Sequence, residues 1–166
     1  MYAFRPFTCA DLPTAARWLQ TPEVVRWWGD PDEQLALLTE DLDEPLMRQW
    51  IVEFEGRPFA YVQAYAPASW PQLHLQDLMA DSVVIDAYIG EPDMLGRGHG
   101  NAFLRAFVQM LMKDGASAVV IDPDAENLRA RRAYARAGFV EQQVVETADG
   151  PTAVMVFMGL QPQPRA

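Results

Sequence analysis

Alternating glycines lead into a long apolar segment past the middle of the chain. The stretch Leu95-Gly96-Arg97-Gly98-His99-Gly100-Asn101 runs directly into residues 102–112, which are mostly apolar. Because glycine has no Cβ atom, the N–H groups of such a loop stay accessible, and a helix that starts there presents the positive end of its dipole. This arrangement predicts an anion-binding turn that wraps a pyrophosphate. A plain glycine turn is the alternative for the loop taken alone.

Two common classes of phosphate-binding loop do not fit this stretch. The loop of nucleoside triphosphatases ends in Gly-Lys-Ser/Thr with its lysine on the phosphates, and this loop ends in Gly100-Asn101-Ala102. A dinucleotide-binding loop has the spacing Gly-x-Gly-x-x-Gly near the first strand, with an acidic residue about 20 positions further on. The glycines here are spaced by two throughout and lie past the middle of the chain.

A second motif follows downstream, where Asp122-Pro123 precedes the stretch Asn127-Leu128-Arg129-Ala130-Arg131-Arg132-Ala133-Tyr134-Ala135-Arg136-Ala137-Gly138-Phe139. Together the two motifs resemble the GNAT N-acetyltransferase superfamily. The resemblance implies that the glycine loop holds the pyrophosphate of coenzyme A, that the second motif forms a helix beside the pantetheine arm, and that acetyl-CoA is the cofactor. Leu95 departs from the family's pattern, which commonly has Gln or Arg there, so the backbone alone is expected to contribute at that position.

The composition is typical of one enzyme domain. The chain has 166 residues, half of them hydrophobic, which is enough to bury about two thirds of its unfolded surface in a single core. With no linker or repeat, one domain spanning residues 1–166 is expected. The start of the chain lacks the apolar core of a signal peptide, no run of about 18 apolar residues is present, and Cys9 has no second cysteine to pair with. We therefore expect a cytoplasmic protein, monomeric or homodimeric, with no membrane partner.

Charge divides the chain into two parts. Its net charge of −10 argues against nucleic acid as a partner and favours a cationic substrate. Residues 1–85 hold 13 acids and 5 bases (net −8), whereas residues 86–166 hold 10 acids and 8 bases (net −2). Most bases of the second part cluster around the two motifs: Arg97, Arg105, Arg129, Arg131, Arg132 and Arg136. An anionic cofactor explains this clustering, and solvated helix faces are the alternative. His74 and His99 lack the spacing of metal ligands, so no metal site is predicted, and His99 is expected to face solvent or the adenosine end of the cofactor.

Periodicity and turn signals predict a mixed sheet flanked by helices. The resemblance implies that this is the GNAT fold, an α/β (α+β) architecture with a mostly antiparallel central sheet. The expected strands are Tyr2–Arg5, Gln49–Glu55, Phe59–Ala66, Val83–Ile89, Ala118–Asp122, Val140–Glu146 and Thr152–Phe157. The expected helices are Thr8–Gln20, a short one that restarts at Thr21-Pro22 and carries Val24, Val25, Trp27 and Trp28, then Asp32–Glu44, a long one from the glycine loop to Lys113, and Asn127–Ala137.

Acetyl transfer to an ammonium group requires a proton acceptor, an oxyanion donor and, ideally, an acid for the departing thiolate. Asp86 is the candidate base, because a carboxylate within an apolar strand is costly unless it is paired or lines a cleft. Tyr134 is the candidate acid. A structural carboxylate and a core aromatic are the alternatives for these two residues. The resemblance also implies an oxyanion donor at the backbone of Ala87 or Tyr88, where the strand bulges.

The resemblance further implies a set of cofactor-binding residues along the strand, the loop and the second motif. These are Ala87, Tyr88, Ile89, Leu95, Gly96, Arg97, Gly98, His99, Gly100, Asn101, Asn127 and Arg132.

Within the superfamily, the chain is most similar to the aminoglycoside 6′-N-acetyltransferases. The similarity lies in Val25-Arg26-Trp27-Trp28-Gly29, Tyr61-x-Gln63-x-Tyr65, Ile85-Asp86, the second motif and Asp149-Gly150-Pro151. It implies that carboxylates and aromatic rings hold a cationic aminoglycoside. The acceptor-binding candidates are Trp28, Tyr65, Trp70, Asp81, Asp86, Asp122 and Asp149, of which Trp70 and Asp81 belong to a loop, Pro67–Asp81, that differs from the family in length and content.

Ordinary structural roles are the alternative for two of these acids, a strand end for Asp122-Pro123 and a hairpin turn for Asp149-Gly150. Two other functions stay open at this stage. One is acetylation of another amine, such as a protein N-terminus, a polyamine or a siderophore precursor. The other is a non-catalytic acyl-CoA binding module, for which loss of the base and the acid is expected.

Overall fold

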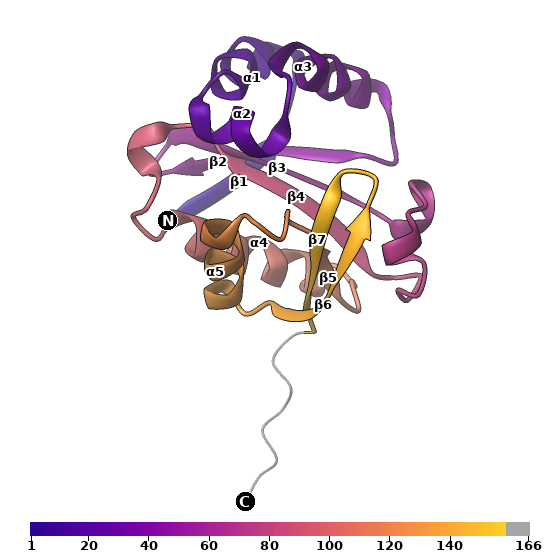
Figure 1. Ribbon diagram of the computed structural model, residues 1–166. Coiled ribbons are helices and arrows are strands. Elements are labelled where there is room, and N and C mark those ends of the chain that lie inside the picture. The colour runs from indigo at the N-terminus through magenta and orange to yellow at the C-terminus, as the bar shows by residue number, and fades with distance from the viewer. Residues whose placement is uncertain (159–166) are drawn as a thin grey trace, which may run out of the picture.

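The computed structural model describes residues 1–158, which are arranged around one seven-stranded sheet (Figure 1). The strand order is β1-β2-β3-β4-β5-β7-β6. Only β4 and β5 pair in parallel, and all other neighbours are antiparallel. The predicted mixed, mostly antiparallel sheet is therefore confirmed. The strands are β1 (Tyr2–Pro6), β2 (Arg48–Phe54), β3 (Arg57–Tyr65), β4 (Val83–Ile89), β5 (Val119–Ile121), β6 (Val140–Thr147) and β7 (Gly150–Phe157).

Within the described residues, five helices flank the sheet, and they divide between its two faces (Figure 1). Three lie over one face: α1 (Leu12–Leu19), α2 (Pro22–Trp28) and α3 (Pro31–Glu40). Two lie on the other: α4 (His99–Lys113) and α5 (Leu128–Ala137). Short 3-10 turns are Cys9–Asp11, Asp41–Asp43, Pro67–Ser69, Leu73–Leu75 and Pro92–Met94. No helix within residues 1–158 has the length and apolar character needed to cross a membrane.

Two predicted helices are shorter in the structure than expected. Thr8 and Asp11 do form a capping box, but it opens a 3-10 turn, and α1 starts at Leu12. The helix expected over Asp32–Glu44 ends at Glu40 and tightens into the turn Asp41–Asp43. The acidic residues at this end explain the early stop, because carboxylates are unfavourable at the negative end of the helix dipole.

The alternation of side chains along β4 divides them between two cores. Ile85 and Ala87 pack towards α4, in the largest hydrophobic cluster, with Phe103 and Phe107. Tyr88 packs on the opposite face, in the cluster that α1, α2 and α3 close. Because successive side chains of a strand point to opposite faces, Asp86 shares the face of Tyr88, beneath the N-terminal helices.

The sheet opens between β4 and β5. The two strands pair at Val83↔Val119 and Val84↔Val120, and β4 then continues to Ile89 without β5 beside it. The N–H of Val83 donates to the Ala118 carbonyl on the β5 side. Since N–H directions alternate along a strand, Ala87 and Ile89 direct their backbone groups into the opening.

The prediction that β4 bulges at Ala87 or Tyr88 is wrong. The register with β3 runs unbroken from Tyr65↔Val84 to Ala60↔Ile89. The backbone of β4 is accessible because β5 diverges from it, and no irregularity within β4 is needed.

Candidate active site

A cavity of about 620 Å³ occupies the opening between β4 and β5. This volume lies within the range of about 300–1,000 Å³ that is typical of small-molecule sites. The exposed edge of β4 runs along it, from Asp86 to Ile89, and the glycine loop, α2, α5 and the end of β5 complete its walls. The cavity therefore joins the two motifs of the sequence with the strand that carries the candidate base.

The glycine loop and the first turn of α4 form one half of the cavity. Gly96 and Gly98 have positive φ angles of 72° and 84°, which non-glycine residues rarely adopt, and Gly98 is the N-cap of α4. Gly96, Gly98 and Gly100 all line the cavity. The N–H groups of the first turn of a helix have no partner within the helix, so this half offers backbone donors at the positive end of the dipole.

Arg129 adds a side-chain charge to this half. Its guanidinium Nη2 lies 3.1 Å from the position that a Cβ atom at Gly96 would take, so the arginine reaches over the loop. Its nearest acid is Glu23, with an N–O distance of 3.9 Å. Arg132 and Arg136 also line the cavity from α5. Bare backbone donors next to a guanidinium suit a pyrophosphate. From the sequence, Arg129 was predicted as part of a basic cluster and not as a cofactor ligand.

Several predicted cofactor residues take other positions or roles. The ring of His99 turns away from the cavity: its Nδ1 atom lies 2.7 Å from the Tyr2 hydroxyl, and its ring centre is 4.7 Å from that of Phe54. The side chain of Arg97 is exposed and does not line the cavity. Asn127 lines the cavity, but its Oδ1 atom caps α5 by accepting from the Ala130 N–H at 3.1 Å.

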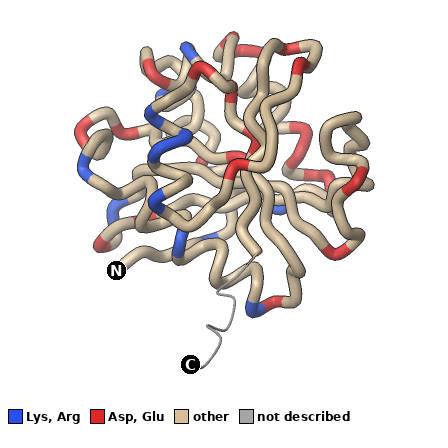
Figure 2. The backbone as a smooth tube through the Cα atoms, turned by 60° about the horizontal axis from the view of Figure 1, so that its bottom comes forward, with Lys and Arg blue, Asp and Glu red and all other residues tan. Residues whose placement is uncertain are grey.

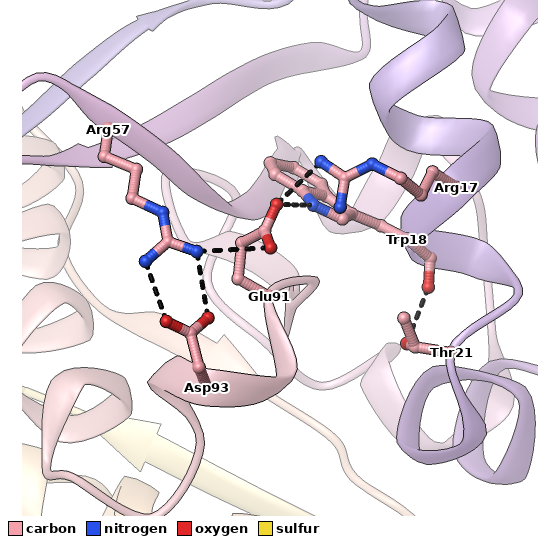
Figure 3. A network of polar contacts seen from close by, with 6 residues as sticks. All are labelled: Arg17, Trp18, Thr21, Arg57, Glu91 and Asp93. Carbon is pink, nitrogen blue, oxygen red and sulfur yellow. Dashed lines mark hydrogen bonds and ion pairs between the residues drawn. The ribbon is translucent and has the colours of Figure 1, made fainter.

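Ion pairs anchor the segment that joins β4 to the glycine loop (Figure 3). Glu91 accepts hydrogen bonds from Arg17 at 2.7 Å and from the Trp18 indole at 2.8 Å, both on α1. Arg57, at the start of β3, binds Asp93 with two hydrogen bonds of 2.8 and 2.9 Å. The hydrogen bond from Arg17 is the main cause that lowers the pKa of Glu91. The loop is thereby attached to both α1 and β3.

Asp86 lies at the centre of the second half. Its Oδ2 atom accepts a hydrogen bond from Gln63 Nε2 at 3.0 Å. The pKa of Asp86 is raised to about 7: burial is the main cause, the negative charge of Asp122 also raises it, and the Gln63 hydrogen bond lowers it. A carboxyl group that titrates near neutral pH can act as a general base.

Asp122 follows β5 and is paired with His74. The Nε2 atom of His74 lies 2.8 Å from Asp122 Oδ2, and both side chains are largely buried. Burial raises the pKa of Asp122, and His74 opposes this shift. The sequence indicates only that His74 lacks the spacing of a metal ligand, and no periodic signal on its irregular segment connects it to a strand end. No group of three His, Cys, Asp or Glu side chains within residues 1–158 is arranged to hold a metal ion.

Aromatic rings close the outer wall of this half. Trp28 meets Tyr88 edge-on, with ring centres 4.9 Å apart, and Tyr88 stacks on Tyr61 at 5.3 Å. Trp27 also lines the cavity. Tyr134 enters from α5, and burial raises its pKa above its ordinary value. Within residues 1–158 the hydroxyl of Tyr134 forms no hydrogen bond.

Four predicted acceptor residues do not line the cavity. Tyr65 and Trp70 pack against each other at 5.4 Å, within a neighbouring hydrophobic cluster. Asp81 is exposed near the opposite end of β4 and accepts a hydrogen bond from the Ser117 hydroxyl at 2.6 Å. Its place at the start of the strand, with the cavity at the strand's far end, keeps it out of reach. Asp149 is exposed at the tip of the β6–β7 hairpin, which rises towards the N-terminal helices (Figure 1).

Positive and negative charges gather on different sides of the molecule. Most Lys and Arg positions lie in the left half of Figure 2, and Asp and Glu positions predominate along its upper and right-hand parts. The cavity repeats this pattern at short range. It is lined by three arginines, Arg129, Arg132 and Arg136, and by four acids, Glu23, Asp86, Asp122 and Asp124.

Known proteins are similar to this chain in sequence and in architecture. Residues 8–147 match the acetyltransferase (GNAT) domain family. An aminoglycoside N(6′)-acetyltransferase type 1 of Klebsiella pneumoniae is 32% identical over 161 residues, covering 92% of this chain and 80% of that protein. A kanamycin resistance protein of Rhizobium radiobacter is 41% identical over 73 residues, covering 43% of this chain and 68% of that protein.

The crystal structure of the aminoglycoside acetyltransferase AAC(6′)-Ib with coenzyme A has a TM-score of 0.85 and 29% identity, and covers 95% of each chain. The same enzyme with coenzyme A and kanamycin has a TM-score of 0.83 and 30% identity, again over 95% of each chain. The predicted family is therefore confirmed, and this chain belongs to the GNAT acetyltransferases, among the aminoglycoside 6′-N-acetyltransferases.

Proposed function

We propose that this chain transfers an acetyl group from acetyl-CoA to the 6′-amine of an aminoglycoside, by direct attack in a ternary complex. One observation carries the proposal: a single cavity joins a half of backbone donors and arginines to a half of buried carboxylates and aromatic rings. The two halves meet at the free edge of β4, where an acyl donor and an amine can come together.

The cofactor half fits coenzyme A by its chemistry. Acetyl-CoA supplies the activated thioester carbonyl. The N–H groups at Gly98–Asn101 and the guanidinium of Arg129 hold the pyrophosphate, by charge-assisted hydrogen bonds and the helix dipole. The free carbonyl of Ala87 and the free backbone groups of Ile89 receive the amides of the pantetheine arm, which adds to β4 as a strand would.

Asp86 accepts the proton that the acceptor ammonium must lose before it attacks. Its pKa of about 7 lets it ionise at neutral pH and still bind a proton during turnover. The nitrogen then attacks the thioester carbonyl carbon, and the carbon–sulfur bond breaks. The ammonium gives up two protons in total and the thiolate takes up one, so the reaction releases one proton.

The N–H of Ala87 is the oxyanion donor in this proposal. The N–H of Tyr88 points towards β3, because Gly90, two residues further on, donates its N–H to the Phe59 carbonyl there. Tyr134 donates a hydrogen bond to the leaving sulfur. Since burial raises its pKa, its hydroxyl stays protonated at neutral pH and is available for this role.

Carboxylates and indole rings hold the aminoglycoside in this proposal. Asp122 binds an ammonium group within the cavity, and Trp28 covers a sugar ring. Asp149 approaches from the hairpin tip and contributes a weaker, exposed charge. A cytoplasmic location, a single domain over residues 1–166 and a monomeric or homodimeric state complete the proposal.

Thiol release from acetyl-CoA tests the proposal, with kanamycin, tobramycin, spermidine and a peptide amine as acceptors. We expect the highest kcat/KM for the two aminoglycosides, with the acetyl group on the 6′-amine by NMR. Preference for spermidine or the peptide would contradict the substrate and leave the acetyltransferase activity. If acetyl-CoA binds but no acceptor releases thiol, the chain is a binding module.

A further inference from the structure

A buried row of polar side chains crosses three strands beneath the N-terminal helices. Gln49 on β2 lies opposite Gln63 on β3, and Gln63 lies opposite Asp86 on β4. Tyr61, two residues before Gln63 on the same strand face, is fully buried, and Gln49 is 9% exposed. Polar groups in such a place are costly unless they are bonded, so the hydrogen bonds of this row are constrained by one another.

The direction of the hydrogen bonds is set at the far end of the row. The Leu38 carbonyl lies in the last turn of α3, where carbonyl groups have no partner further along the helix, and a carbonyl oxygen only accepts. Gln49 Nε2 donates to it at 3.2 Å and also to the Tyr61 hydroxyl at 2.9 Å. The hydroxyl of Tyr61 therefore directs its own hydrogen to Gln63 Oε1, at 2.8 Å.

Gln63 is left with one favourable orientation. Since its oxygen accepts from Tyr61, its Nε2 group donates to Asp86 Oδ2, at 3.0 Å. A reversed amide would place Oε1 against the carboxylate and an N–H group against the hydrogen of Tyr61. The row thus presents a fixed donor to Asp86, and a donor favours the ionised form of a carboxyl group.

We infer that Gln49 and Tyr61 are positioning residues, which act through the amide of Gln63 to keep Asp86 ionised as a proton acceptor. The inference rests on the proposed role of Asp86 as the base. Neither residue lines the cavity, so both act on catalysis without touching a substrate.

The other groups around Asp86 do not supply such a donor. Asp122 is an acid whose hydrogen-bond partner is His74, and it raises the pKa of Asp86. Tyr61, Tyr65 and Tyr134 all have pKa values raised by burial and stay neutral near pH 7. The Gln63 hydrogen bond is therefore the contribution that opposes burial and Asp122.

The pH dependence of kcat for kanamycin acetylation tests the inference. The variants Gln63→Leu, Tyr61→Phe and Gln49→Leu interrupt the row at increasing distance from Asp86. We expect the midpoint of the acid limb to rise by about one pH unit in Gln63→Leu and by about half a unit in Tyr61→Phe, and by less in Gln49→Leu. At pH values above the limb, kcat of Tyr61→Phe and Gln49→Leu should return to nearly the wild-type value.

Thr39→Val is the matched control, because it removes the hydrogen bond from Thr39 Oγ1 to the Leu35 carbonyl on the same helix and leaves the row intact. Its pH profile should be that of the wild type. A second control combines Tyr61→Phe with Asp86→Asn, where the Tyr61 change should cause no further shift of the profile.

Two outcomes would overturn the inference and leave Asp86 as the base. One is an unchanged midpoint in both Gln63→Leu and Tyr61→Phe. The other is a loss of kcat that is equal at all pH values, which would indicate structural damage alone. If Asp86 is not the base, the result is different: Asp86→Asn by itself would keep both wild-type turnover and the acid limb of the pH profile.

Discussion

In the proposed function, the two halves of the cavity recognise charge with different parts of the chain. The cofactor half uses backbone N–H groups of an exposed loop, where Gly96 and Gly98 supply the required positive φ angles. The acceptor half uses side chains, with Asp86 and Asp122 brought together from two strands and desolvated by the surrounding structure.

This difference separates binding from proton transfer. A backbone donor has no titratable group, so the cofactor half should respond to shape and change little with pH. A buried carboxylate pays a desolvation cost when it ionises, so the acceptor half should respond to protonation and to the neighbouring charges. Changes in the acceptor half should therefore act on turnover, acceptor binding and pH dependence. Changes in the loop should act on the KM for acetyl-CoA.

The largest expected effect concerns Asp86. Asp86→Asn should lower kcat about 100-fold or more, because the acceptor ammonium loses its proton acceptor, while the KM for acetyl-CoA stays close to the wild-type value. In the wild type, kcat should fall as pH drops through about 7, where Asp86 becomes protonated. Steady-state kinetics over this pH range measure both effects. Asp114→Asn, an exposed carboxylate at the end of α4, should change neither. Wild-type turnover in Asp86→Asn would remove this residue from the mechanism.

The same substitution should stabilise the fold at alkaline pH. In the unfolded chain the carboxyl group ionises near its ordinary pKa of 3.8, whereas in the folded chain it keeps its proton up to about pH 7. The folded state binds more protons between these values, so the free energy of unfolding falls as pH rises through this window. Asparagine avoids this loss. We expect urea denaturation at about pH 8 to show a gain of about 1–3 kcal/mol in Asp86→Asn, and little gain at about pH 4. An equal difference at both pH values would contradict the raised pKa.

Asp122 tests whether the acceptor half binds by charge. Asp122→Asn should weaken aminoglycoside binding by about 1.5–3 kcal/mol, or about 10- to 150-fold in the acceptor KM, because a buried hydrogen bond to an ammonium group becomes neutral. The KM for acetyl-CoA serves as the internal control. Parallel increases in both KM values would indicate that the whole cavity had been disturbed.

The two halves of the cavity differ in how far the sequence predicts them. The stretch Gly96–Asn101 could be found because its geometry is local: glycines supply the φ angles, and α4 begins within it, at His99. Asp86 could be singled out because a carboxylate interrupts the apolar strand Val83–Ile89. The strands and most helices followed from periodicity, and their bounds shifted only at the ends.

Contacts between distant segments could not be predicted. His74 meets Asp122 from 48 residues away, on a segment without regular periodicity, and no local pattern encodes that distance. The reach of Arg129 over Gly96 likewise depends on how α5 packs beside the loop. Asp81 was placed in the acceptor site on chemistry alone, although its position at the start of β4 sets it apart from the cavity.

Gly98 tests whether the cofactor half binds by backbone shape. A Cβ atom there would meet only Asn101 Oδ1, at 3.7 Å, so the space above it is open to a ligand. Gly98→Ala should raise the KM for acetyl-CoA about tenfold, through strain at a positive φ and obstruction of the pyrophosphate, with kcat nearly unchanged. Gly115→Ala is the matched control, since Gly115 also has a positive φ and lies beyond the opposite end of α4. A similar rise in both variants would trace the effect to strain in the helix.

The smallest expected effect concerns the exposed charge at the hairpin tip. Asp149 is solvated, and an exposed ion pair contributes only about 0.2–1 kcal/mol, so Asp149→Asn should raise the kanamycin KM no more than about fivefold. This contribution is screened by salt, whereas that of the buried Asp122 is screened much less. The increase caused by Asp149→Asn should therefore disappear at an ionic strength of about 1 M, while the increase caused by Asp122→Asn persists. Kanamycin KM values for wild type and both variants at low and high salt measure this. If the two variants lost their effects equally with salt, the distinction between a buried and an exposed acceptor charge would not hold.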